Sequence, residues 1–291
     1  MKRIAILGCE NSHANAFLKF IKEKEKEEFS DVEIVGVYSE KTEASEKLNA
    51  KFGVPIMNDH SEAVGKIDGL IITARHGDNH YKYAKPYIDS GIPMFIDKPI
   101  TISESEAVEF MRRLKEKSIR ISGGSSLKQD VFIRELKQDA KKCVGGKTIG
   151  GYVRAPYQSE SVYGGFYFYA QHLVEMVCEI FGRYPISVTA KQNGSQIHVL
   201  FHYEKYDCVG LFCDKNNFYF ASRMSETDAK SFVIPTTDDW FYEEFKEFYG
   251  ILSGESQKVT YKEFVSPVFI MNAIERSLKS GKEELVGKIE L

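Results

Sequence analysis

Asp97 and Lys98 follow directly after residues 94–96, an apolar run that suits a buried parallel strand. The carboxyl ends of parallel strands are where open α/β sheets bind their ligands. A lysine at such an end, followed by Pro99, which fixes the turn, is well placed to contact a small molecule. An exposed ion pair at the end of a surface strand is the alternative, and the sequence on either side decides between the two.

A second group of reactive side chains lies on a predicted helix, residues 166–181. His172 lies one turn after Phe168 and Tyr169 and one turn before Glu175, so the four side chains share one face of the helix. A tyrosine, a histidine and a carboxylate on one stripe can relay a proton. A core histidine hydrogen-bonded to Glu175 explains the same spacing, and both interpretations stay open.

The turn after the first predicted strand is a candidate phosphate-binding loop. A dinucleotide-binding turn has the pattern Gly-x-Gly-x-x-Gly, because glycine lets the backbone approach a pyrophosphate at a helix N-terminus. Residues 8–13 keep only Gly8 of this pattern, and Glu10 puts a negative charge where a pyrophosphate would lie. Ser12 and the free N–H groups of the following helix can still hold phosphate. An ordinary strand–helix turn fits equally well.

The end of the second predicted strand bears on the type of dinucleotide. An NAD site usually has a carboxylate here, which accepts hydrogen bonds from the ribose hydroxyls. Ser39 occupies the expected position, and its side chain would not repel the 2′-phosphate of NADP. Lys41 would attract that phosphate, whereas Glu40 argues for NAD. These residues leave the choice between NAD and NADP open.

Strands and helices alternate in the first half of the chain, which predicts a parallel, doubly wound sheet of Rossmann type. Strands are predicted at residues 4–7, 32–38, 55–57, 70–73, 93–97 and 119–121, and helices at residues 42–52, 80–90 and after a capping box at 103–106. The second half contains strand-like runs at residues 148–155, 186–190, 196–203, 207–213 and 218–223, with helices at 127–142, 166–181, 239–252 and 267–280. Several of these runs alternate apolar with polar residues, which is typical of an antiparallel sheet with one covered face. We therefore expect an α/β protein with a Rossmann domain at residues 1–122. An α+β domain with a large, mostly antiparallel open sheet is expected at residues 123–291.

The composition argues against several classes of protein. The chain has 291 residues, of which 43% are hydrophobic, enough for one large or two ordinary domains. A net charge of −3 without a basic block does not indicate a nucleic-acid partner. No apolar stretch is long enough to span a bilayer, and the N-terminus lacks a signal-peptide pattern. The five cysteines lack Cys-x-x-Cys spacing, so we expect a cytoplasmic protein without a metal site. One charge run, residues 22–28, alternates in sign and predicts the solvated end of a helix.

Nearly the whole chain resembles the Gfo/Idh/MocA oxidoreductases, the glucose–fructose oxidoreductase and inositol dehydrogenase superfamily. Residues 91–99 match the family's stretch that ends in Glu-Lys-Pro, with Asp97 in place of glutamate. The supporting features are Gly8 after the first strand, the strand 71–73 leading to His80, Gly164 with Gly165, the helix that carries His172 and Glu175, and the closing residues 273–277. The resemblance implies a Rossmann domain followed by an α/β domain whose open sheet commonly forms oligomer contacts.

The resemblance also implies roles for individual residues. Lys98 matches the family's catalytic lysine and His172 its catalytic histidine, and Tyr169 is the nearest polar substitute for an aspartate that many members have at the position of Phe168. The residues expected to bind the cofactor are Gly8, Glu10, Asn11, Ser12, His13, Ser39, Glu40, Thr73, His80, Asp97 and Lys98. The residues expected to contact substrate are Lys98, Arg154, Tyr157 and His172. The implied cofactor is NAD or NADP.

The function expected from these features is hydride transfer between NAD(P) and a sugar, a polyol or a sugar-derived secondary alcohol. Two alternatives stay open: a non-catalytic regulator that binds cofactor or sugar, and an NAD-dependent enzyme with no net redox change, such as a glycosidase. We also expect a homodimer or homotetramer, because the aromatic residues on the second-domain strands need cover. These residues are Phe201, Tyr203, Phe212, Phe218 and Phe220.

Overall fold

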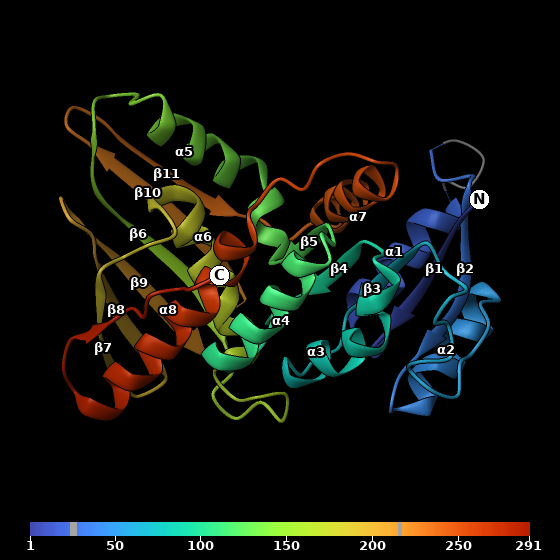
Figure 1. Cartoon of the computed structure of the whole chain (residues 1–291). Helices are drawn as coiled ribbons and strands as arrows, with labels where there is room; N and C mark the ends of the chain where they lie inside the picture. Colours follow the sequence, from blue (N-terminus) through green and yellow to red (C-terminus); the bar gives the residue numbers. More distant parts are fainter. Residues whose placement is uncertain (24–27, 215–216) are drawn as a thin grey trace.

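The chain is built around two sheets (Figure 1). The computed structural model describes residues 1–23, 28–214 and 217–291. The first sheet is parallel, with the strand order β2-β1-β3-β4-β5. Its strands are β1 (Lys2–Leu7), β2 (Val32–Tyr38), β3 (Gly69–Ile72), β4 (Met94–Asp97) and β5 (Ile121–Gly124). The predicted doubly wound sheet is confirmed, and the predicted strand at residues 55–57 is only a single bridge between Ile56 and Val37.

The helices agree with the sequence pattern except at three places, one of which is the predicted helix 127–142, where a 3₁₀ helix (Ser126–Gln129) precedes an α-helix (Val131–Lys141) that is capped by Asp130. The α-helices of the described residues are α1 (Ser12–Glu23), α2 (Thr42–Phe52), α3 (Asp78–Ala84), α4 (Glu104–Glu116), α5 (Val131–Lys141), α6 (Tyr167–Phe181), α7 (Asp239–Leu252) and α8 (Tyr261–Ser280). The predicted helix 80–90 is α3 followed by the 3₁₀ helix η1 (Lys85–Ser90). The predicted start of the last helix at Pro267 is wrong, because α8 begins after Thr260, which forms a capping box with Glu263 in the first turn of the helix. Residues 24–27 of the alternating charge run lie outside the described residues.

Helices cover both faces of the first sheet, and two of them come from the C-terminal half of the chain. On one face, α1, α2 and α7 pack against the sheet through a buried cluster that includes Phe17, Leu48 and Phe245. On the other face, α3, α4 and the beginning of α8 pack through a second cluster that includes Phe110 and Val268. The proposed division of the chain after residue 122 stays a prediction, since segments beyond it complete the cover of the first sheet.

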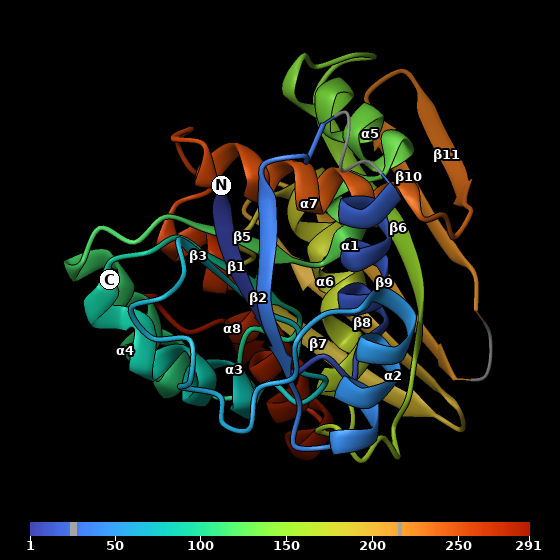
Figure 2. The same cartoon turned by 90° about the vertical axis from the view of Figure 1, so that its right-hand side faces the viewer.

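The second sheet has the strand order β11-β10-β6-β9-β8-β7-β12. Its strands are β6 (Thr148–Tyr157), β7 (Ser187–Asn193), β8 (Gln196–His202), β9 (Asp207–Asp214), β10 (Tyr219–Ser225), β11 (Ala229–Ile234) and β12 (Glu284–Leu285). The pair β6 and β9 is parallel and the other neighbouring pairs are antiparallel. Figure 2 shows this sheet at the right, with α6 and α8 on its inner side. The predicted mostly antiparallel sheet is therefore confirmed.

The aromatic residues expected on the uncovered face of this sheet do not all lie there. Phe201 and Phe212 are fully buried in the core beneath α6 and α8. Strand residues alternate between faces, so the outer face carries Phe220 beside the exposed Val233, with Met224 four residues further along β10. The predicted assembly stays untested, and the side chains that would support it are partly different from those expected.

No helix in the described ranges combines the length and the apolar composition needed to cross a membrane.

Candidate active site

The end of β4 and the helix α6 meet at one cavity of about 630 Å³. Lys98 is the first residue after β4, and His172 lies in the second turn of α6. The fold thus brings together two residues that are 74 positions apart in the sequence. Of the residues expected from the sequence, the ones that line this cavity are Asn11, Ser12, His13, Lys98, Tyr169 and His172.

A buried carboxylate connects several of the residues that line this cavity. Asp97 is completely buried, and its Oδ2 lies 2.9 Å from Nδ1 of His13 and accepts a 2.8 Å hydrogen bond from Nδ2 of Asn11. Its Oδ1 accepts a hydrogen bond of 2.7 Å from the backbone N–H of Lys98. Burial alone would raise the pKa of Asp97, but the charges of His13 and Lys98 outweigh it and hold that pKa below its ordinary value. An ionised Asp97 therefore connects the turn after β1 with the end of β4.

The ammonium group of Lys98 lies against two aromatic rings. Its Nζ is 4.9 Å from the ring centroid of Phe168 and 5.9 Å from that of Tyr169, and the side chain is buried at the cavity wall. A cation over an aromatic face is attracted by the negative face of the ring. Phe168, at the position where many family members are expected to have an aspartate, thus gives Lys98 a cation–π contact. The peptide bond between Lys98 and Pro99 is cis.

His172 is oriented by a serine. Its Nδ1 lies 2.7 Å from Oγ of Ser125, which leaves Nε2 as the other ring nitrogen. Burial, followed by the nearby charges of Lys98 and His13, lowers the pKa of His172 well below its usual value. The imidazole is therefore neutral at neutral pH, the form that accepts a proton.

The interpretation of His172 as a core histidine hydrogen-bonded to Glu175 is wrong, because the partner of its Nδ1 is Ser125. The carboxylate of Glu175 accepts a hydrogen bond of 2.9 Å from Nη2 of Arg183, and it also contacts the side-chain amide of Gln171. Tyr169 lies beside the imidazole, with ring centroids 5.5 Å apart, but the hydrogen-bond partner of His172 is Ser125. This face of α6 therefore contributes the rings of Phe168 and Tyr169 beside Lys98 and the ring of Tyr169 beside the imidazole, whereas the hydrogen bond to the imidazole comes from Ser125.

The turn that carries Ser125 depends on a glycine. Gly123, in β5, has φ +114°, and a Cβ at this position would lie 2.0 Å from the carbonyl oxygen of Ile96 in β4. Without a side chain there, β5 can pair closely with β4 and bring Ser125 to the same sheet edge as Lys98. Oγ of Ser125 also accepts a hydrogen bond from the N–H of Leu127 at the start of η2 (Ser126–Gln129). These contacts hold the serine in place for His172.

A second cavity, of about 420 Å³, adjoins the first. Asn11, Arg75 and Tyr163 line both cavities. Nζ of Lys41 donates a 2.6 Å hydrogen bond to the hydroxyl of Tyr163, and the guanidinium of Arg75 lies 5.2 Å from the centroid of the same ring. Tyr163 belongs to the loop after β6, so this contact joins the loop to the edge of the first sheet. Hydrogen bonding to Lys41, together with the charge of Arg75, holds the pKa of Tyr163 below its ordinary value.

Glu10 turns away from the N-terminus of α1. Its Oε2 accepts a 2.7 Å hydrogen bond from the hydroxyl of Ser39, and its Oε1 accepts one of 3.1 Å from the backbone N–H of Arg75. The carboxylate of Glu40 instead pairs with Nζ of Lys82 at 2.6 Å. The negative charge of Glu10 is therefore directed to the end of β2.

Three of the expected cofactor residues lie under the loops rather than in either cavity. A Cβ on Gly8 would lie 2.4 Å from the backbone of Ala74, so Gly8 is needed for the close approach of two loops. Thr73 Oγ1 donates to the carbonyl of Gly8. The buried ring of His80 lies between the carbonyls of Ala74 and Ile100, and burial lowers the pKa of His80. Gly8, Thr73 and His80 thus support the loops that carry the lining residues.

Two expected substrate contacts are not brought to the cavity. Val153 packs in the core under α6, so Arg154, the next residue of β6, points to the opposite face of the sheet. There its guanidinium lies 3.8 Å from the ring centroid of Phe218. Tyr157 is buried in the core beside Phe212, with ring centroids 6.0 Å apart. The assignment of Arg154 and Tyr157 to the substrate is therefore withdrawn.

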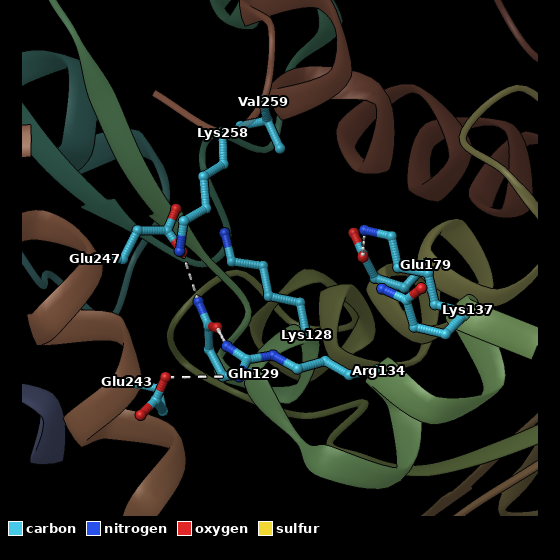
Figure 3. A pocket seen from close by; sticks show the side chains of 10 residues that line it. Lys128, Gln129, Arg134, Lys137, Glu179, Glu243, Glu247, Lys258 and Val259 are labelled. Carbon is cyan, nitrogen blue, oxygen red and sulfur yellow. Dashed lines mark hydrogen bonds and ion pairs between the residues drawn. The ribbon is translucent and has the colours of Figure 1, made fainter. Parts of the chain in front are cut away.

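A separate cavity of about 370 Å³ lies between α5, α6 and α7 (Figure 3). Its charged lining residues face one another: Lys137 pairs with Glu179, and Lys258 lies 3.5 Å from Glu247. Arg134 also lies 3.5 Å from Glu243, so three of the four cations of this cavity face carboxylates, and we assign no ligand to it. No group of three or more potential metal ligands is found among the described residues.

Four residues near the site were missed by reasoning from the sequence. Ser125 follows a glycine pair at a strand end, and that position could have identified it. Arg75 lies in the loop that follows β3, which is also at the carboxyl end of a strand of the first sheet. Tyr163 and Tyr219 carry no local signal, because only tertiary packing places them at the cavity wall.

Comparisons with known proteins agree with this architecture. Residues 2–125 match the model of a family described as "Oxidoreductase family, NAD-binding Rossmann fold". This match confirms the resemblance noted above for residues 2–125 and, at the level of NAD(P), the expected cofactor class. No curated protein sequence gives a significant match to the chain.

Solved structures share the fold over nearly the whole chain. A scyllo-inositol dehydrogenase from Lactobacillus casei, with bound NAD(H) and scyllo-inositol, has a TM-score of 0.85 at 13% identity and covers 99% of this chain and 100% of its own. A myo-inositol dehydrogenase from Corynebacterium glutamicum ATCC 13032 has a TM-score of 0.83 at 14% identity and covers 99% of each chain. A myo-inositol 2-dehydrogenase from Lactobacillus plantarum has a TM-score of 0.83 at 14% identity, covering 98% of this chain and 99% of its own. At these identities the likeness establishes the common fold.

Proposed function

The N-terminal part of the chain is a domain of the Gfo/Idh/MocA oxidoreductases, and from this premise we propose that the protein is an NAD(P)-dependent dehydrogenase. Its proposed substrate is a sugar, a polyol or a sugar-derived secondary alcohol. The observation that carries the proposal is that Lys98 and His172 line one cavity of about 630 Å³, next to a second cavity at the start of α1. The inositol dehydrogenases that share the fold support the choice of substrate class.

The residues at these cavities fit a nicotinamide dinucleotide. Ser12, the N–H groups of the first turn of α1 and the guanidinium of Arg75 offer donors and positive charge for a pyrophosphate. The adjoining cavities, of about 420 and 630 Å³, provide room for the two halves of the cofactor. When bound, the nicotinamide supplies the acceptor for the hydride that leaves the alcohol carbon.

The protein's own part in the reaction is to hold the alcohol and to take its proton. We assign proton removal to Nε2 of His172, because Nδ1 is held by Ser125 and the ring is neutral. Lys98, fixed against Phe168 and Tyr169, holds the alcohol oxygen and stabilises the negative charge that develops on it. In the reverse direction, the same groups return the proton.

The test is steady-state kinetics on a panel of polyols and sugars with NAD⁺ and NADP⁺, followed by nicotinamide absorbance. Mass spectrometry of the ligand that copurifies with the protein guides the panel. Net reduction supports the dehydrogenase. Product without net reduction supports a non-redox enzyme, and binding without product supports a regulator.

With an active substrate, Lys98→Met and His172→Ala should each lower kcat by roughly 10²–10⁴-fold with little change in cofactor affinity. The low pKa of His172 places the acidic limb of the pH–rate profile below about pH 6.5, and His172→Ala should remove that limb. Lys137→Met, a lysine of the charged cavity in Figure 3, is the matched control and should leave kcat unchanged. Wild-type turnover in both site variants would refute the assignment.

A further inference from the structure

The carboxylate of Glu10 lies at the end of β2, although Glu10 itself follows β1. The backbone N–H groups of Gly8 and Cys9 both donate to the carbonyl of Tyr38, the last residue of β2, at 2.8 and 3.0 Å. This contact holds the turn after β1 against the end of β2. From there the side chain of Glu10 reaches the hydroxyl of Ser39, 2.7 Å away. Ser39 occupies the position at the end of β2 where an acid is expected, and the carboxylate of Glu10 lies beside it in the structure.

The contacts of the neighbouring residues leave this role to Glu10. The hydroxyl of Ser39 accepts a hydrogen bond from the N–H of Lys41 at 3.1 Å, so its own hydrogen is directed to Glu10. Glu40 pairs with Lys82 at 2.6 Å. Both carboxylate oxygens of Glu10 are held by the protein, one by Ser39 and the other by the backbone of Arg75. The carboxylate is therefore preorganised.

The carboxylate of Glu10 retains the capacity to accept hydrogen bonds. An ionised carboxylate has about four acceptor positions, and the two contacts to Ser39 and Arg75 use one on each oxygen. Glu10 lines the cavity of about 420 Å³ next to α1 and α2. A pair of adjacent hydroxyl groups in that cavity can donate to the two oxygens at once, because a carboxylate presents two parallel acceptors.

We propose that the carboxylate of Glu10 accepts hydrogen bonds from the adenosine ribose of the cofactor, so that the protein binds NAD(H) and discriminates against NADP(H). Two vicinal hydroxyls donate to the carboxylate, whereas a 2′-phosphate would bring a second negative charge against it. This inference rests on the proposed function and adds the identity of the dinucleotide and the residue that selects it.

Two of the three positive charges in the same cavity are engaged away from the end of β2. Lys41 and Lys47 line it with Arg75, but Nζ of Lys41 is hydrogen-bonded to Tyr163, and Arg75 lies at the junction with the larger cavity, where a pyrophosphate would pass. Glu43 adds a second carboxylate to the lining. The charge at the strand end itself is that of Glu10.

The experiment is calorimetric titration with ADP-ribose and with 2′-phospho-ADP-ribose, which isolate the adenosine half, and with NAD⁺ and NADP⁺. The wild-type protein should prefer the ligands without the 2′-phosphate by at least tenfold. Glu10→Gln should weaken binding of ADP-ribose and NAD⁺ by about 10- to 100-fold, since charge-assisted hydrogen bonds are lost, and should remove the discrimination. Glu43→Gln, a carboxylate of the same cavity, is the matched control and should keep it.

A second variant moves the acid back onto β2. In the double variant Glu10→Gln with Ser39→Asp, the new carboxylate takes the ordinary position at the strand end and should restore the preference for NAD⁺. Thermal unfolding of each variant shows that it is folded. Equal affinity of the wild-type protein for NAD⁺ and NADP⁺, or a ratio unchanged by Glu10→Gln, would overturn the inference and leave the proposed function standing. Absence of binding to all four ligands would overturn the proposed function and this inference with it.

Discussion

Glu244 is a buried carboxyl group whose removal should stabilise the protein. It lies on α7, is 1% exposed, and both of its oxygens are buried without a hydrogen-bond partner among the described residues. Burial, together with the negative charge of Asp97, raises the pKa of Glu244 well above its ordinary value, although Lys128 and Lys98 act in the opposite direction. The folded protein therefore keeps a proton on Glu244 at a pH at which the unfolded chain has released it.

The sign and the size of the effect follow from this difference. In the unfolded chain Glu244 titrates near pH 4.3. Above that pH the folded state binds one more proton than the unfolded state, so the free energy of unfolding falls as pH rises, by about 1.4 kcal/mol per pH unit. The fall stops at the folded-state pKa of Glu244, above which both states are ionised. The full stability is present only below about pH 4.3.

Glu244→Gln removes this titration and keeps the shape of the side chain. Relative to the wild-type protein, its melting temperature should rise by an amount that increases with pH, by roughly 3–6 °C per pH unit within the window. The assay is thermal unfolding followed by circular dichroism between pH 5 and 8 at constant ionic strength. The pH at which the gain levels off reports the folded-state pKa of Glu244.

Glu247→Gln, one turn further along α7, is the control and should have the opposite sign. Glu247 accepts a 2.8 Å hydrogen bond from Gln129. Burial alone would raise the pKa of Glu247, but the charge of Lys128, that hydrogen bond and the charge of Lys258 hold it below its ordinary value. Its stabilisation is present above about pH 4.3 and is lost as pH falls through its folded-state pKa. A gain for Glu244→Gln that does not change with pH, or a loss that grows with pH, would refute the reasoning.

Two further predictions concern the site and the assembly. Ser125→Ala removes the partner of His172 Nδ1, and a buried unsatisfied group costs about 1–3 kcal/mol. The kcat should therefore fall by roughly 5- to 150-fold with unchanged cofactor affinity, and Ser125→Thr should restore most of the kcat. Equal rates in the Ala and Thr variants would contradict the orienting role of Ser125. The outer face of the second sheet carries the exposed Met224 and Val233 with the half-buried Phe220, and we expect a homodimer or homotetramer by light scattering. A 33.2 kDa monomer at micromolar concentration would contradict this expectation. Val233→Lys should weaken the assembly if this face forms the interface.

Much of the fold could be predicted because its signals are local. The apolar run before Asp97 and the alternation of strands with capped helices specify a parallel sheet whose edge carries Lys98. The same local reasoning failed at α8, where a proline at position 267 suggested a helix start, although the capping box at Thr260 begins the helix earlier. Pro267 is accommodated inside α8, so the proline alone did not determine the boundary.

The site was less predictable because contacts there join distant parts of the chain. The face of β6 on which Arg154 lies depends on which side packs against α6, and a strand read one residue out of register exchanges its two faces. Nothing near Glu10 in the sequence shows that its side chain turns to Ser39.

The sequence by itself determined the sheet type, the strand end that presents Lys98 and the helix that presents His172, since apolar periodicity and capping act over a few residues. Only the tertiary structure decided that Ser125 orients the imidazole, that Phe168 faces the lysine and that Glu10 supplies the acid at the end of β2. These contacts depend on how closely two strands or loops can approach, and that distance is set by packing across the whole sheet.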